Sequence, residues 1–299
     1  MIKCHLNFRE PCLDDADFVH RYVVHALQSD LAFPNLYLLK NKYGTEILFH
    51  MEHLFRRFTG NGRLSGYAFP TGINNELTDA CIKAIEADAK ARNEELKFCL
   101  LTQEQADYLE KIYGPKAQIK CDRGDADYLY KRDDLAELPG TLYHKKRTHV
   151  NKFLRNYPSA EFKILTPENK NDALKVAGLW LNSQVDSPAL QHEYRAIENA
   201  LFHMEQLKMT GGLVYVQDSP VAMALCSTIN NRVTDIHYEK CIPEFRDAYA
   251  FINREIASCA ETEWINREED LNIEGLRTAK LSYHPSLILQ KYTATIYVD

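Results

Sequence analysis

The chain has 299 residues, 45% of them hydrophobic, and a formal net charge of −6. This composition excludes a disordered or fibrous protein and is typical of a globular one. The length predicts two domains, since single domains usually stay below roughly 200 residues. The acidic balance argues against a protein that coats nucleic acid throughout, although it leaves room for a local anion-binding surface.

Eight cysteines are scattered along the chain, and none forms a C-x-x-C pair. This spacing favours buried thiols in a reducing compartment over a zinc site or a disulfide framework. The first residues lack the apolar core of a signal peptide, and no run approaches the ~18 apolar residues of a transmembrane helix. We therefore expect a cytoplasmic protein with no transmembrane segment, no metal site and no obligate partner.

The first half of the chain mixes predicted strands and helices. Hydrophobic periodicity predicts strands over 6–8, 46–49, 64–69 and 96–101, and helices over 14–28, 76–92 and 103–113. Mixed order of this kind predicts an α/β or α+β domain. We assign it to residues 1–135.

A basic segment follows at mid-chain, where no acid occurs from His144 to Arg155. Its apolar residues recur at helical spacing, namely Val150, Phe153, Leu154 and Tyr157. With Thr141 as N-cap and Pro158 as a stop, the pattern predicts a helix over 142–156 within a basic linker at 136–160. Its cations form a candidate surface for a phosphate-bearing partner, and they are Lys145, Lys146, Arg147, Lys152 and Arg155. The alternative is a solvated surface helix.

The second half, residues 161–299, has a clearer order of elements. Two helices are predicted over 172–183 and 192–208, and Gly211-Gly212 is expected to interrupt the chain. A meander of three strands, a helix, a strand, a helix and a strand follow, at 213–217, 221–229, 233–241, 246–260, 264–266, 275–283 and 292–298.

Three stretches of this sequence resemble a known family. They lie at 125–153, 236–257 and 264–285, and the last, WINREEDLNIEGLRTAKLSYHP, is the most specific. They are similar to bacterial proteins related to the soluble C-terminal domain of phosphatidylglycerol lysyltransferase. The resemblance implies an α+β fold of two tandem GNAT-like acyltransferase domains, each with a mostly antiparallel sheet flanked by helices. It also implies kinship with tRNA-dependent aminoacyl transferases, with an aminoacyl-tRNA or an acyl-CoA as donor.

The segment that would hold the pyrophosphate of acetyl-CoA departs from the GNAT pattern. A helix N-terminus attracts an anion through its free amides and dipole, and GNAT enzymes use two glycines there. Residues 244–250 carry Arg246 but neither glycine, and Asp247 adds negative charge. This departure argues against ordinary acetyl-CoA binding.

Polar residues on the third meander strand and after residue 265 form the predicted site. In GNAT enzymes a Glu on this strand is the general base and a Tyr can act as acid, which points to Glu239 and Tyr283. Strand alternation predicts that His237 and Glu239 share a face. The expected substrate-binding residues are His237, Tyr238, Arg246, Asn266, Glu269, Arg277, Lys280 and His284. If 275–283 is helical, Arg277 and Lys280 share one face with Tyr283 or His284.

Two classes of function remain open. The first is an enzyme, an acyl- or aminoacyltransferase that acts on an amine or hydroxyl, with the basic helix on the acceptor stem of tRNA or on a phosphorylated donor. An acetyl-CoA-dependent N-acyltransferase is a variant of it. The second is a non-catalytic module on a degenerate fold that binds an anion, a lipid headgroup or RNA. The missing glycines at 244–250 motivate the second class.

Overall fold

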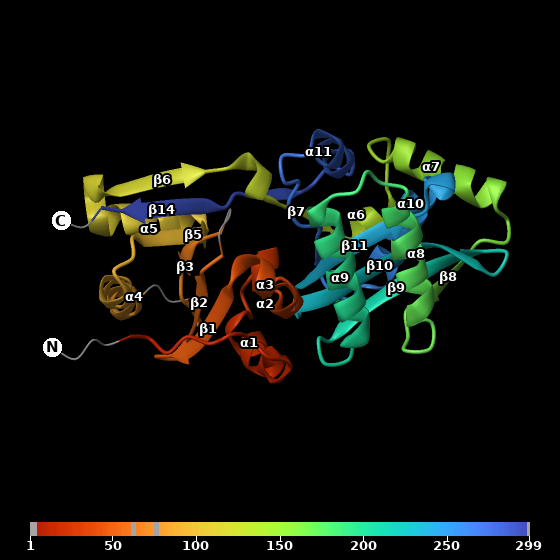
Figure 1. Cartoon of the computed structure of the whole chain (residues 1–299). Helices are drawn as coiled ribbons and strands as arrows, with labels where there is room; N and C mark the ends of the chain where they lie inside the picture. The colour runs from red at the N-terminus through yellow and green to blue at the C-terminus, as the bar shows by residue number, and fades with distance from the viewer. Residues whose placement is uncertain (1–4, 61–63, 75–77, 298–299) are drawn as a thin grey trace. The chain divides into compact units, whose positions relative to one another are not determined.

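The computed structural model describes residues 5–60, 64–74 and 78–297 and contains two compact units (Figure 1). The first unit comprises Met1–Asp127, Glu269–Ile273 and Ile288–Asp299, and the second comprises Tyr128–Glu268 and Glu274–Leu287. This division differs from the predicted bounds 1–135, 136–160 and 161–299. The C-terminal strand lies inside the first sheet, and the basic helix packs within the second unit rather than forming a linker.

The first unit is built on a sheet that has seven strands in the described residues, in the order β1-β2-β3-β5-β14-β6 with β4 beside β2. Its strands are β1 (Thr45–His50), β2 (His53–Phe58), β3 (Gly66–Ala68), β4 (Thr71–Gly72), β5 (Leu96–Leu101), β6 (Ala117–Cys121) and β14 (Tyr292–Ile296). The pair β3–β5 is parallel, and the other pairs are antiparallel. Its helices are α1 (Ala16–Tyr22), α2 (Phe33–Leu38), α3 (Lys40–Tyr43), α4 (Asp79–Arg92) and α5 (Gln103–Tyr113).

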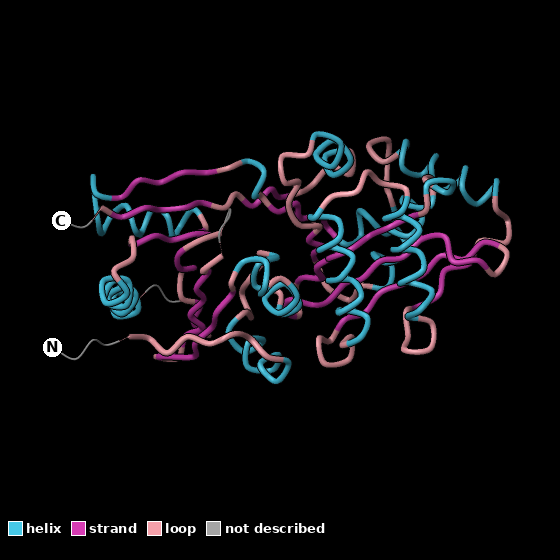
Figure 2. Tube along the Cα trace, in the orientation of Figure 1, coloured by secondary structure: helices cyan, strands magenta, loops and turns pink. Residues whose placement is uncertain are grey.

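The second sheet also has seven strands among the described residues, in the order β13-β7-β12-β11-β10-β9-β8. Its strands are β7 (Asp127–Lys131), β8 (Glu161–Ile164), β9 (Met209–Val216), β10 (Ser219–Asn230), β11 (Val233–Cys241), β12 (Trp264–Asn266) and β13 (Leu287–Leu289). The helices are α6 (Arg132–Glu137), α7 (His144–Asn156), α8 (Lys170–Asn182), α9 (Pro188–Phe202), α10 (Ala248–Cys259) and α11 (Glu274–Leu281). The pair β11–β12 is parallel, and the pairs β10–β11, β9–β10, β7–β12 and β8–β9 are antiparallel. Figure 2 shows the alternation of helices and strands along both units.

Helices cover both faces of the second sheet. On β11, Lys240 reaches Glu193 of α9, with 2.8 Å between its Nζ and the Oε1, whereas the adjacent Glu239 contacts Asn253 of α10. Neighbouring residues of a strand point to opposite faces, so α9 and α10 lie on opposite sides. The expected α+β fold, with two mostly antiparallel sheets flanked by helices, is confirmed.

Most predicted elements are present, with shifted ends. The helix predicted over 14–28 ends at Tyr22, and the helix predicted over 192–208 is α9, Pro188–Phe202. The strand predicted over 6–8 is absent from the described residues, where Arg9 forms one isolated bridge to Ile47. The predicted helix start at 76 and strand end at 298 lie outside the described residues.

The expected interruption at Gly211-Gly212 is wrong, because both glycines lie inside β9. A Cβ on Gly211 would come within 2.1 Å of the Ala224 carbonyl oxygen, and one on Gly212 within 2.3 Å of the Phe162 ring. Glycine here permits close pairing of β9 with its neighbours. Among the described residues, no helix is both long and apolar enough to cross a bilayer.

Candidate functional site

Glu239 lies at the centre of a polar cluster in the second unit. Its carboxylate oxygens lie 3.3 and 3.4 Å from the Arg267 Nη2, and Asn253 Nδ2 donates to Oε2 at 3.2 Å. Asn253 is fully buried on α10, and only 10% of the Glu239 side chain is exposed. The carboxylate is thus held in one orientation by an ion pair and an amide from two different elements.

Two aromatic rings line the other side of Arg267. Its guanidinium carbon lies 4.8 Å from the ring centre of Tyr283 and 5.9 Å from that of Tyr130. Burial lowers the pKa of Arg267, but Glu239, Tyr130 and Tyr283 together outweigh burial, so the pKa is raised overall. Burial raises the pKa of Tyr283, so this phenol remains protonated at neutral pH. The cluster therefore combines a proton acceptor, a fixed cation and a phenolic proton donor.

Lys146 of α7 completes this cluster. Its ammonium lies 3.6 Å from the ring centre of Tyr283, a cation–π contact. Burial, followed by the nearby charge of Arg267, lowers the pKa of Lys146 to about 8, while Glu239 opposes the shift. Near neutral pH, this amine is therefore unusually close to losing its proton.

We expect one lysine of the folded protein to titrate near pH 8. Reductive ¹³C-methylation followed by NMR should show one dimethyl-lysine signal with that midpoint, and the signal should be missing in Lys146→Arg. In Glu239→Gln the midpoint should fall further, because the charge that favours the ammonium is lost. A Lys146 signal that titrates with the exposed lysines would contradict the burial and charge assigned to this residue.

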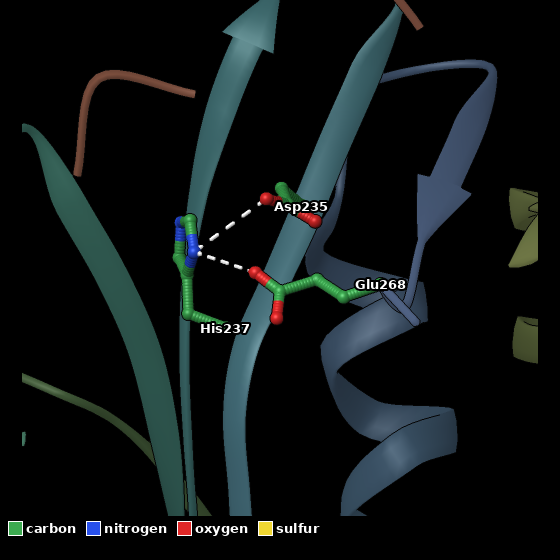
Figure 3. A group of neighbouring side chains, drawn as sticks. All are labelled: Asp235, His237 and Glu268. Atoms are coloured by element: carbon green, nitrogen blue, oxygen red, sulfur yellow. Dashed lines mark hydrogen bonds and ion pairs between the residues drawn. The ribbon is translucent and has the colours of Figure 1, made fainter. Parts of the chain in front are cut away.

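His237 and Glu239 do not share a face of β11, contrary to the prediction. Leu225 pairs with Tyr238 but Cys226 pairs with Ile236, so His237 is an extra residue in β11. Such a β-bulge resets the alternation of side chains. His237 Nδ1 lies 3.2 Å from Glu268 Oε1 (Figure 3). The other ring nitrogen, Nε2, lies 2.8 Å from Ser227 Oγ. His237 thus belongs to a second cluster of the same unit.

The residues predicted after 265 have mixed placements. Asn266 is buried and accepts the Glu268 amide at 2.7 Å, and Lys280 is buried with its ammonium donating to the Arg267 carbonyl. Lys280 therefore helps to hold the backbone of Arg267 in place instead of facing solvent. Glu269 belongs to the first unit, where it pairs with Lys291 at 2.7 Å.

The remaining predicted residues, Tyr238, His284, Arg277 and Arg246, also belong to the second unit. Tyr238 is buried, with its ring 6.4 Å from that of His237. His284 is exposed and packs edge-on against Tyr143 at 5.6 Å. Arg277 is half-buried on α11, and Arg246 is exposed before α10. Because α11 ends at Leu281, Tyr283 does not extend the helical face of Arg277 as expected.

The basic helix is α7, and its apolar stripe is confirmed, with Val150 and Phe153 buried. Three of its five cations have protein partners. Lys146 lies over Tyr283, Arg147 donates to the Leu138 carbonyl, and Lys152 pairs with Asp247 at 2.7 Å. The two that remain, Lys145 and Arg155, are exposed. The outward charge of α7 is therefore smaller than its sequence indicates.

Three residues of the Glu239 cluster were missed by sequence reasoning. Arg267 and Asn253 sit in charged or apolar stretches without a distinguishing pattern, and Tyr130 lies on a strand far away in sequence. Only the pairing of β7, β12 and β11 brings Tyr130, Arg267 and Glu239 together. The one available signal was the position of a charged residue directly after the predicted strand 264–266.

Comparison with known proteins gives one family match that covers most of the chain. The family model described as "Phosphatidylglycerol lysyltransferase, C-terminal" matches residues 21–295. An uncharacterized protein of Mycoplasmoides gallisepticum is 26% identical over 206 residues, 64% of this chain. The match spans 66% of the length of that curated relative.

Two solved structures share the fold over nearly the whole chain. A conserved protein of unknown function from Bacteroides thetaiotaomicron is 34% identical, with a TM-score of 0.91, and the match covers 98% of this chain and 100% of that one. The C-terminal domain of a putative lysylphosphatidylglycerol synthetase from Agrobacterium fabrum is 15% identical, with a TM-score of 0.65, over 95% of this chain and 93% of that one. This chain therefore shares its fold with the C-terminal domain of that putative synthetase.

Proposed function

Since the chain belongs to the phosphatidylglycerol lysyltransferase C-terminal family, we propose that it is an aminoacyltransferase that moves an aminoacyl group from aminoacyl-tRNA to an amine or hydroxyl acceptor. The observation that carries this proposal is the convergence of Glu239, Arg267, Tyr283 and Lys146 in one cluster. A proton acceptor, a fixed cation and a protonated phenol are the groups that acyl transfer requires.

Each group has a distinct role in the proposed step. Glu239 accepts the proton of the acceptor, directly or through a water, as its nitrogen or oxygen attacks the ester carbonyl carbon. A new bond forms to that carbon, and the bond from the carbon to the tRNA ribose oxygen breaks. Arg267 stabilises the negative charge that develops on the carbonyl oxygen, and Tyr283 donates a proton to the leaving oxygen.

The segment before α10 supports tRNA as donor in preference to acetyl-CoA. Side chains occupy the region where GNAT enzymes expose free amides. Asp247 is held by Lys152 at 2.7 Å and by His149 at 3.0 Å, and the Phe245 ring packs on Tyr157 at 4.8 Å. An acid at this helix N-terminus occupies the position that an incoming phosphate would need.

A donor panel tests the proposal. Purified protein is incubated with tRNA charged with labelled amino acids, or with labelled acetyl-CoA, in the presence of a small-molecule and lipid-extract acceptor library. We expect label to move from aminoacyl-tRNA and not from acetyl-CoA. Label transfer from acetyl-CoA alone, or binding of RNA without any transfer, would refute the proposal and favour the acetyl-CoA enzyme or the non-catalytic module respectively.

Charge reversal on α7 is expected to weaken tRNA binding. Lys145 and Arg155 are exposed cations of α7 outside the contacts described above, so Lys145→Glu with Arg155→Glu should lower the dependence of log affinity on log salt by about 2, near 0.9 per lost phosphate contact. Binding is measured by fluorescence anisotropy at several salt concentrations. The matched control is Lys111→Glu with Lys120→Glu, on exposed positions of the first unit. An equal loss in both double variants would show that α7 has no special role.

A further inference from the structure

A second cluster, on the other side of the β11 bulge from Glu239, joins a histidine to two carboxylates and a hydroxyl. His237 Nδ1 lies 3.2 Å from Glu268 Oε1 and 3.5 Å from Asp235 Oδ2. Figure 3 shows the side chains of Asp235, His237 and Glu268 together, and one nitrogen or oxygen atom of each lies within 4.8 Å of the other two. Asp235 is fully buried. Ser227, also buried, faces the opposite ring nitrogen. All four residues belong to the second unit.

From this geometry we propose that Asp235, His237 and Glu268 bind a divalent transition-metal ion, with zinc as the best match. Zinc bonds of about 2.0–2.1 Å in a tetrahedron place neighbouring ligand atoms about 3.3 Å apart. The distances from His237 Nδ1 to Glu268 Oε1, 3.2 Å, and to Asp235 Oδ2, 3.5 Å, lie on either side of that value. One imidazole nitrogen and two carboxylate oxygens are a normal ligand set for zinc and leave a fourth position for water.

The position of Ser227 fits a metal-bound imidazole. When Nδ1 binds an ion, the ring proton is on Nε2, and that N–H needs an acceptor. The Ser227 hydroxyl oxygen lies 2.8 Å away from Nε2. The ring is thereby fixed in the tautomer that presents its Nδ1 lone pair to the two carboxylates. A nucleophilic role for Ser227 is disfavoured, since it is 2% exposed in the middle of β10.

The two negative charges of the cluster are a second reason to expect a bound cation. Asp235 and Glu268 bring two carboxylates to one ring nitrogen, which has a single position for a proton or an ion. A divalent cation at this position would balance both carboxylate charges at once. Glu268 reaches this position from a left-handed backbone, with φ of 55°, directly after Arg267. The ion would tie β11 to the segment that carries Arg267, so it would also fix the position of that guanidinium.

The test is zinc binding by metal-stripped protein, measured with a chromogenic competitor and by elemental analysis. We expect one equivalent of Zn²⁺ to bind and to raise the melting temperature of the wild-type protein. Glu268→Gln, whose side chain is partly exposed, and Asp235→Asn should remove this equivalent. Ser227→Ala should weaken binding by roughly 10- to 100-fold. Glu263→Gln, an exposed carboxylate nearby in sequence, is the control and should bind as the wild type does.

Two outcomes would overturn the proposal. The first is that Glu268→Gln keeps both the equivalent of zinc and the thermal shift, because the ion would then be held elsewhere, for example by an exposed cysteine. The second is that wild-type protein binds no zinc, which would leave His237 hydrogen-bonded without an ion. Co²⁺ substitution adds a further check, since the proposed site gives a tetrahedral spectrum without thiolate charge-transfer bands. Neither readout depends on the proposed transfer activity.

Discussion

Glu239→Gln is expected to slow aminoacyl transfer by about 10²- to 10⁴-fold, the usual contribution of a positioned general base. Glutamine has nearly the same shape, so binding of donor and acceptor should change little. The loss should therefore appear in kcat rather than in KM. Single-turnover transfer from labelled aminoacyl-tRNA measures this rate directly.

The fold of Glu239→Gln is expected to survive. The glutamine carbonyl oxygen can still accept from Arg267, and its amide needs an acceptor in place of the lost Oε2. Asn253 offers one, because its Oδ1 has no hydrogen-bond partner among the described residues. A rotation of the Asn253 amide restores the contact, so we expect a loss of about 1–3 kcal/mol in the free energy of unfolding.

Glu193→Gln is the matched control for this rate. Glu193 pairs with Lys240 at 2.8 Å on the opposite face of the second sheet. Its removal should leave the transfer rate near that of the wild type. Equal rates for Glu239→Gln and the wild type would contradict the role of Glu239 as base, even if the protein proves to be a transferase.

Lys291→Met is expected to destabilise the protein by about 3–5 kcal/mol at pH 8, the usual result of leaving buried charges without a partner. Lys291 is 3% exposed, and its ammonium lies 2.8 Å from Asp127 Oδ1 and 2.7 Å from Glu269 Oε1. Asp30 lies 3.5 Å away. Methionine fills the space but leaves these carboxylates together in the core of the first unit.

The loss of stability in Lys291→Met should become smaller as the pH falls. Burial raises the pKa of Asp127 to about 6, although Lys291 opposes the shift. Without Lys291 the pKa of Asp127 should rise further, so the folded variant takes up a proton at a higher pH than the unfolded chain does. Its stability therefore increases as pH falls, and the difference from the wild type should be smaller at pH 5 than at pH 8.

Urea unfolding at both pH values measures this effect. Lys120→Met, an exposed position in the same unit, is the control and should change the free energy of unfolding by no more than about 0.5 kcal/mol. A Lys291→Met variant as stable as that control would show that the ammonium does not hold the buried carboxylates.

Local patterns predicted the elements well, because periodicity and capping act over a few residues. The amphipathic helix over 142–156 was found as α7, and the strand 233–241 was found with the same ends. The predicted N-cap Thr141 was too early by two positions, since Tyr143 precedes the first helical residue. Glu239 could be selected because the resemblance to GNAT enzymes points to a Glu on this strand.

The rest of the site depends on long-range pairing. No local signal places β14 between β5 and β6, or β7 beside β12, because these pairings join segments that are far apart in sequence. The sequence also gives no sign of the β-bulge at His237, which puts His237 and Glu239 on different faces of β11. The outward charge of the basic helix was judged from its sequence, whereas Asp247 and the Leu138 carbonyl compensate part of that charge.

One measurement tests the central claim most directly. Wild-type protein and Glu239→Gln are given aminoacyl-tRNA and acetyl-CoA together with a lipid and amine extract, and the mass added to each acceptor is determined. The account predicts that acceptors gain the mass of an amino-acid residue with the wild type, and gain far less with the variant. Acceptors that gain only an acetyl group, or an aminoacyl mass that is the same with both proteins, would contradict it.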